Sequence, residues 1–138
     1  MSRELENEVQ LFIKNTGIEL CENTYKLLKY RGNIMRCGEC FVLVKLSRLN
    51  KPFWGLNGAL IDLLINNSFK FFCIFLINEQ EGWIFPAKEF RYMLMSSKWK
   101  KNEKKQYIVN SPLPDKWSFS NISKYNMLYN TYVLEDSN

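Results

Sequence analysis

Residues 69–86 have the sequence FKFFCIFLINEQEGWIFP, and this stretch decides the fold. Segment 69–77 is almost continuously apolar, which is typical of a central strand covered on both faces. The turn residues 79–82 and the short apolar run 83–85 predict a second strand, paired with the first in a hairpin. Pro86 suits the first position of a helix, because that position leaves a backbone N–H unpaired in any case. We therefore expect a buried strand pair followed directly by a helix.

The same periodicity predicts elements on both sides of this stretch. Apolar residues recur at helical spacing in segments 3–15, 56–65 and 86–97, and segment 41–47 is a strand rich in branched side chains. A last helix is expected over 122–129. Helices and strands that alternate in this way indicate a mixed α/β (α+β) fold. We expect a central mixed sheet of about four to five strands with helices packed on it.

Other segments are less regular. Segment 19–31 fits a short helix or a strand, and its pattern does not decide between them. Residues 48–55 are expected to form a loop around Pro52, and Ser118 or Ser120 is expected to cap the last helix. A length of 138 residues predicts one domain over 1–138, with a loose C-terminal tail over 131–138.

Composition restricts the class of protein. Hydrophobic residues make up 46% of the chain, enough to bury a core without metal or disulfide support. No apolar run approaches the roughly 20 residues that span a bilayer, so no membrane partner is expected. The first residues lack the apolar stretch of a signal peptide, which favours a cytoplasmic location.

Histidine is absent from the sequence, so catalytic triads and metal sites that depend on histidine are excluded within this chain. Cys37 and Cys40 form a CxxC pair that could be half of a zinc site or a redox pair. The pair precedes a strand instead of opening a helix, which favours a turn with two reduced thiols. Cys73 lies in the most apolar strand and is expected to be a core residue. We expect no cofactor and assign no metal ligands.

The formal net charge of +5 favours polyanionic partners. Two stretches carry the candidate contacts. In the first, Lys45 to Gly55, cations and aromatic residues lie at or beyond the end of a predicted buried strand. Here Lys45, Arg48 and Lys51 could hold phosphates while Trp54 stacks on a base. The alternative is that Trp54 anchors the loop to the core while the cations are solvated.

The second stretch is the densest run of charge in the chain. Residues 98–105 have the sequence KWKKNEKK and form a charged loop or hairpin arm. Lysine would position a phosphate backbone without specifying a base sequence. A solvated loop tip is the alternative. The nucleic-acid candidates in this stretch are Lys98, Trp99, Lys100, Lys101, Lys104 and Lys105.

The strand over 41–47, with Lys45 near its end, resembles the lysine-bearing strand of restriction-endonuclease-like (PD-(D/E)XK) nucleases. The later stretch, Phe71 to Pro86 and its helix, is similar to that fold as well. In that family an acidic residue stands two positions before the lysine, where this chain has Leu43. The acids hold the magnesium that activates water, so the resemblance implies a degenerate member without cutting activity.

These observations favour a non-catalytic nucleic-acid-binding domain, with DNA preferred over RNA, in a defence, restriction or mobile-element context. The main alternative is a protein-interaction module such as an inhibitor, immunity protein or accessory subunit, whose tryptophans would form a flat apolar patch away from the lysines. A third hypothesis is a metal-dependent nuclease in which Glu39 and Asp62 converge near Lys45.

Overall fold

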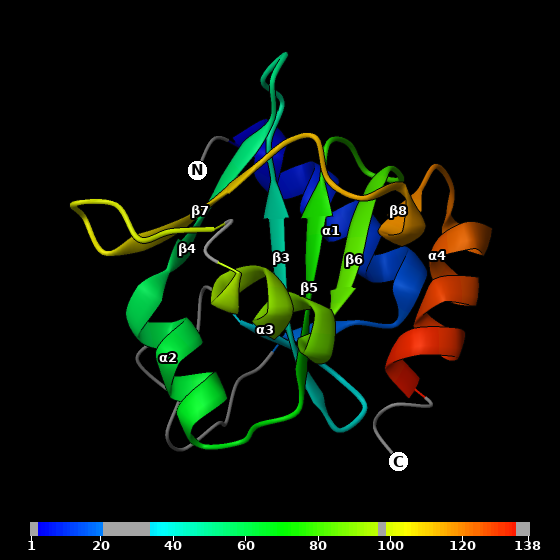
Figure 1. Ribbon diagram of the computed structural model, residues 1–138. Coiled ribbons are helices and arrows are strands. Elements are labelled where there is room, and N and C mark those ends of the chain that lie inside the picture. The colour runs from blue at the N-terminus through cyan, green and yellow to red at the C-terminus, as the bar shows by residue number, and fades with distance from the viewer. Residues whose placement is uncertain (1–2, 21–33, 97–98, 135–138) are drawn as a thin grey trace.

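The computed structural model describes residues 3–20, 34–96 and 99–134 (Figure 1). Its main sheet has the strand order β1-β2-β3-β5-β6-β8. β3 and β5 are parallel and the other neighbours are antiparallel, so the sheet is mixed. The predicted mixed α/β class is confirmed. The sheet has six strands, two of which are only two residues long: β1 Glu19–Leu20, β2 Met35–Cys37, β3 Cys40–Leu46, β5 Phe71–Leu76, β6 Gly82–Pro86 and β8 Ser118–Phe119.

β5 is the buried centre of the sheet, as its sequence predicts. All six of its residues are buried. Phe71, Cys73 and Phe75 belong to one core cluster and the alternate residues to another, because successive side chains of a strand point to opposite faces. β5 continues through a turn into β6, which confirms the predicted hairpin.

Helices cover both faces of the sheet (Figure 1). The first face packs against α1 (Arg3–Thr16), α4 (Ile122–Leu128) and the π-helix η3 (Tyr129–Leu134). The second face packs against α2 (Gly58–Asn66) and α3 (Ala87–Met95). The fold is therefore a sheet between two helical layers, which explains why β5 needs no polar face.

A second, two-stranded sheet lies on the side of α2 and α3. It joins β4 (Phe53–Asn57) to β7 (Gln106–Asn110) in antiparallel register, from Phe53 opposite Asn110 to Asn57 opposite Gln106. The prediction of a loop over 48–55 is therefore wrong for its last three residues. Pro52 and Gly55 are turn-like locally, but the strand is stabilised by a partner about fifty residues away.

The C-terminal region differs from the sequence prediction in two ways. Asn121, not Ser118 or Ser120, caps α4, because its side-chain oxygen accepts a hydrogen bond of 2.8 Å from the Lys124 N–H. Residues 131–134 lie in η3, where Val133 is buried, so this part of the expected loose tail is helical. Residues 135–138 lie outside the described part of the chain, as does 21–33, most of the segment that fitted either helix or strand.

Over the described ranges, no helix combines the length and the apolar character that crossing a membrane requires.

Candidate nucleic-acid interface

The lysine-rich stretch forms a hairpin that projects from the body of the molecule (Figure 1). We name residues 100–108 the lysine hairpin. Its arms are joined by backbone hydrogen bonds from Ile108 N to Lys100 O (3.1 Å) and from Asn102 N to Gln106 O (2.8 Å). At the tip, the Asn102 side chain accepts a hydrogen bond of 2.9 Å from Gln106 N. The hairpin has exposed lysines at four positions: Lys100, Lys101, Lys104 and Lys105.

Two buried tryptophans anchor this hairpin. Trp99, directly before it, is 3% exposed and packs against Phe85 and Phe90 at ring-centroid distances of 5.2 and 5.3 Å. Trp54, on the partner strand β4, is 2% exposed and donates an indole hydrogen bond of 3.1 Å to Leu76 O. The expectation that either indole stacks on a base is therefore corrected. Both rings are core residues that hold the hairpin on a rigid base.

A polar contact also ties the hairpin to α2. Lys101 Nζ lies 2.6 Å from the Asp62 carboxylate, and the Tyr107 hydroxyl donates to the same carboxylate at 2.9 Å. This hydrogen bond from Lys101 to Asp62 raises the pKa of the lysine. Lys101 is thus committed to positioning the hairpin. In contrast, Lys100, Lys104 and Lys105 have no carboxylate partner within the described ranges.

A hollow of about 440 Å³ lies where the hairpin meets the start of α2. Its lining includes three lysines and one carboxylate, that of Asp62, which is paired with Lys101; the full set is Asn57, Ala59, Asp62, Lys101, Lys104, Lys105 and Gln106. The first turn of α2 contains no acidic residue, and a helix N-terminus carries a partial positive charge. The lysines and the helix end therefore combine to favour a negatively charged group at this place.

Arg48 and Lys51 do not join this surface. They lie at the opposite end of β4, about 20 Å from the hairpin tip at roughly 3.3 Å per strand residue. Arg48 forms a bidentate ion pair with Glu8 of α1, with an Nε–Oε2 distance of 2.9 Å. The two cationic stretches that the sequence offers as nucleic-acid contacts therefore do not form one phosphate-binding surface. Lys98 lies outside the described residues.

Lys45 is half-buried near the end of β3. Lys45 is two residues after Leu43 on the strand, so both lie on the face that packs against α2 and α3. Burial lowers the pKa of its ammonium group. No carboxylate contacts Lys45 in the described part of the chain. A direct phosphate contact by Lys45 is not favoured by this placement.

The carboxylates of the metal-dependent nuclease hypothesis do not converge. Glu39 lies in the turn before β3, so roughly 20 Å of strand separate it from Lys45. Asp62 is already engaged by Lys101 and Tyr107. Among residues 3–20, 34–96 and 99–134, no three acidic, cysteine or histidine side chains gather in a way that could hold a metal ion. The hypothesis is removed by this geometry.

The CxxC pair closes the β2–β3 hairpin. Cys37 and Cys40 are opposite each other in the strand register, and Gly38 adopts φ +59° in the turn between them. A positive φ at this position is what a two-residue hairpin turn requires, and glycine adopts it without strain. Cys37 Sγ lies 3.5 Å from the Tyr129 hydroxyl oxygen, and the buried Cys73 forms no disulfide with a described residue. The predicted turn before the strand is confirmed, and the reduced state of its two thiols stays a prediction.

The tryptophan patch required by the protein-interaction alternative does not form. Trp54, Trp99 and Trp117 are buried, and Trp83 is half-buried against the same core. The four tryptophans therefore belong to the core or pack against it.

Sequence reasoning missed a second group of cations. Lys70, Lys88 and Arg91 line a groove beside α3, although they lie in two separate segments of the chain. A partial signal was present, because Lys88 and Arg91 are three residues apart on a predicted helix and therefore share a face. Lys70 could not be connected with them before the fold was known.

No protein-family model matches the chain, and no curated protein is similar to it. The function is therefore inferred from the residues of the chain itself.

Proposed function

We propose that this protein is a non-catalytic nucleic-acid-binding domain that holds the phosphate backbone of duplex DNA with the lysine hairpin. The observation that carries the proposal is the placement of Lys100, Lys104 and Lys105, all exposed and without carboxylate partners in the described ranges, on a projecting hairpin. Lys101 acts as a positioning residue through Asp62. Binding of this kind gains its free energy largely from the release of counterions around the phosphates.

The shape of the hairpin supports DNA in preference to RNA. A two-stranded ribbon fits the major groove of B-form DNA, which is about 12 Å wide. The major groove of A-form RNA is deep and narrow, and side chains do not enter it readily. Lysine supplies charge without the forked geometry that selects a base, so we expect little dependence on base sequence.

The absence of cutting activity is part of the proposal. In the restriction-endonuclease-like resemblance, Lys45 would stand where the family has its catalytic lysine. Here the half-buried Lys45 forms no ion pair with a described carboxylate, and Glu39 and Asp62 are placed elsewhere. Such a site lacks ligands for the magnesium ion that activates water in these nucleases.

The experiment compares two variants that lose the same charge. One carries Lys100→Ala, Lys104→Ala and Lys105→Ala in the hairpin, and the matched control carries Lys14→Ala, Lys51→Ala and Lys124→Ala, all exposed. Binding of a fluorescent 20-bp DNA duplex at low salt should weaken at least about tenfold in the hairpin variant. The control should stay within about threefold of the wild type.

Two results would overturn the proposal. One is the absence of duplex binding by the wild-type protein at low salt. The other is an equal loss of affinity in both variants, because the hairpin would then contribute only its net charge. An RNA duplex of the same sequence tests the preference for DNA and should bind more weakly.

A further inference from the structure

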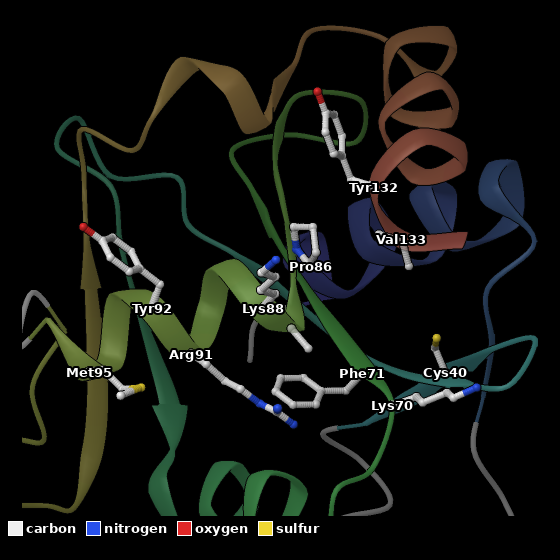
Figure 2. A pocket seen from close by; sticks show the side chains of 11 residues that line it. Cys40, Lys70, Phe71, Pro86, Lys88, Arg91, Tyr92, Met95, Tyr132 and Val133 are labelled. Carbon is white, nitrogen blue, oxygen red and sulfur yellow. The ribbon is translucent and has the colours of Figure 1, made fainter. Parts of the chain in front are cut away.

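A groove of about 630 Å³ lies between α3 and the C-terminal helix η3 (Figure 2). Phe71 of β5 and Pro86 of β6, both buried, form its inner surface. Tyr132 and Val133 come from η3 on one side, and α3 supplies the other. The volume falls in the range of small-molecule sites, roughly 300–1,000 Å³. This groove is lined by none of the hairpin residues.

The charge of the groove is positive. Lys70, Lys88 and Arg91 line it, and the described lining residues include no carboxylate. Lys70 is paired with Glu39, which is not a lining residue, at an Nζ–Oε2 distance of 3.6 Å. Lys88 and Arg91 have no such partner in the part of the chain that the structure describes.

Two features of α3 favour the binding of an anion in the groove. Lys88 and Arg91 are three residues apart on one helix face, a spacing at which like charges repel and destabilise the helix. In addition, the Arg91 Nε atom is buried without a hydrogen-bond partner. Figure 2 shows the Arg91 side chain running from α3 toward the ring of Phe71. A phosphate in the groove would balance both charges and accept hydrogen bonds from the guanidinium fork.

The rest of the groove suits a flat aromatic group. Tyr92 is 58% exposed at the rim, and Tyr132 lies on the opposite side. The groove continues into a smaller hollow of about 330 Å³ that shares Tyr92 and Tyr132 and adds Lys116 and Trp117. Lys116 Nζ lies over the rings of Trp117 and Tyr132, at 4.8 and 5.1 Å from their centroids. One acidic side chain, Glu89, lines this smaller hollow.

We propose that the α3–η3 groove is a binding site for a nucleoside monophosphate, either free or as the 5′-terminal nucleotide of a strand. Arg91 holds the phosphate with its guanidinium fork, and Lys88 adds positive charge to the same groove. The base stacks against Tyr92 at the rim, where aromatic side chains bind any base through its flat face. The site is separate from the lysine hairpin and does not depend on the hairpin binding DNA.

The first measurement is calorimetric titration of the full chain with AMP, adenosine and inorganic phosphate as separate probes. AMP should bind at least about tenfold more tightly than adenosine, because only AMP carries the phosphate that Arg91 holds. It should also bind more tightly than inorganic phosphate, which lacks the base. Equal affinity for AMP and adenosine, or no binding of AMP at millimolar concentration, would overturn the assignment.

Variants locate the binding in the groove. Arg91→Gln and Lys88→Gln should each weaken AMP binding about tenfold, whereas Lys124→Gln on α4 should leave it unchanged. Lys88 is exposed, so its variant stays informative even if Arg91→Gln perturbs the fold. AMP affinity that is the same in Lys88→Gln and in the wild type would contradict the assignment. The hairpin variant should retain AMP binding, which separates this site from the proposed DNA contact.

The source of the nucleotide is distinguished by a further probe. A short single-stranded oligonucleotide with a 5′-phosphate is compared with the same strand without it. Tighter binding of the phosphorylated strand, lost in Lys88→Gln, identifies a strand end as the ligand. AMP binding without any preference for the phosphorylated strand identifies the free nucleotide. Either result supports the site. The proposal is overturned if AMP binds no better than adenosine and the 5′-phosphorylated strand binds no better than the unphosphorylated one.

Discussion

Lys45 is a cationic residue in a largely apolar environment. Its ammonium group is mostly buried on the α2–α3 side of β3, and burial lowers its pKa below the ordinary value of 10.5. A lysine with a lowered native pKa binds its proton more tightly in the unfolded chain, so protonation favours unfolding. The resulting loss of stability is present below the native pKa and diminishes as the pH rises toward the unfolded value. Trp54 shows the contrast, because the only polar atom of its buried side chain, the indole nitrogen, donates a hydrogen bond to Leu76 O.

Lys45→Met should therefore stabilise the protein at pH 7. Replacing a buried, unpaired ammonium with an apolar side chain of similar length should raise the free energy of unfolding by about 1–2 kcal/mol. The gain should shrink as the pH approaches 10, since the wild-type lysine then loses its charge. Urea denaturation at several pH values measures this, with the exposed Lys51→Met as control. A destabilised Lys45→Met variant would show that the ammonium has an anionic partner.

The start of α4 tests the capping assignment at the scale of one element. Asn121→Ala removes the acceptor for the Lys124 N–H and should cost about 1 kcal/mol of stability. Ser120→Ala, one residue earlier and exposed, should change stability by less than about 0.5 kcal/mol. Thermal unfolding of the two variants compares them directly. A larger loss of stability in Ser120→Ala than in Asn121→Ala would show that Ser120 caps α4.

The contact between α2 and the lysine hairpin depends on Gly58. Its N–H donates to Lys105 O at 3.1 Å, and a Cβ atom at this position would lie only 2.3 Å from that oxygen. Gly58→Ala should therefore displace the hairpin and cost about 2 kcal/mol of stability. Gly55→Ala is the matched control, because its Cβ would meet the flexible Gln106 side chain at 3.5 Å.

DNA affinity provides the second measurement for this pair of variants. Gly58→Ala should bind duplex DNA more weakly than Gly55→Ala, since the lysines depend on the position of the hairpin. Equal stability and equal affinity in the two alanine variants would mean that the close approach to Lys105 does not fix the hairpin.

At the scale of the whole molecule, the apolar pattern of a segment predicted those elements whose burial depends on that pattern alone. The continuous apolar run of β5 and the helical spacing of α1, α2 and α3 were sufficient to place those elements and the mixed α/β class. The strand β4 was not visible, because its stability comes from pairing with β7 far along the chain. Tertiary contacts overrode the turn-like character of Pro52 and Gly55.

Some residues of the candidate site could likewise be identified from the sequence, and others only from the fold. The charge density of residues 98–105 identified the hairpin lysines without a structure. Sequence could not show that Arg48 pairs with Glu8, forty residues earlier, or that Trp54 and Trp99 are buried anchors. Sequence also could not show that Lys70 and Arg91 line the same groove, because no local pattern encodes a groove formed by separate elements.

The salt dependence of duplex DNA binding tests the central claim most directly. Each lysine that neutralises a phosphate contributes roughly 0.9 to the slope of the logarithm of the association constant against the logarithm of salt concentration. The variant lacking Lys100, Lys104 and Lys105 should therefore have a slope shallower than the wild type by nearly 3, while the Lys14, Lys51 and Lys124 control should keep the wild-type slope. Parallel salt dependences for the wild type and the hairpin variant would contradict the account.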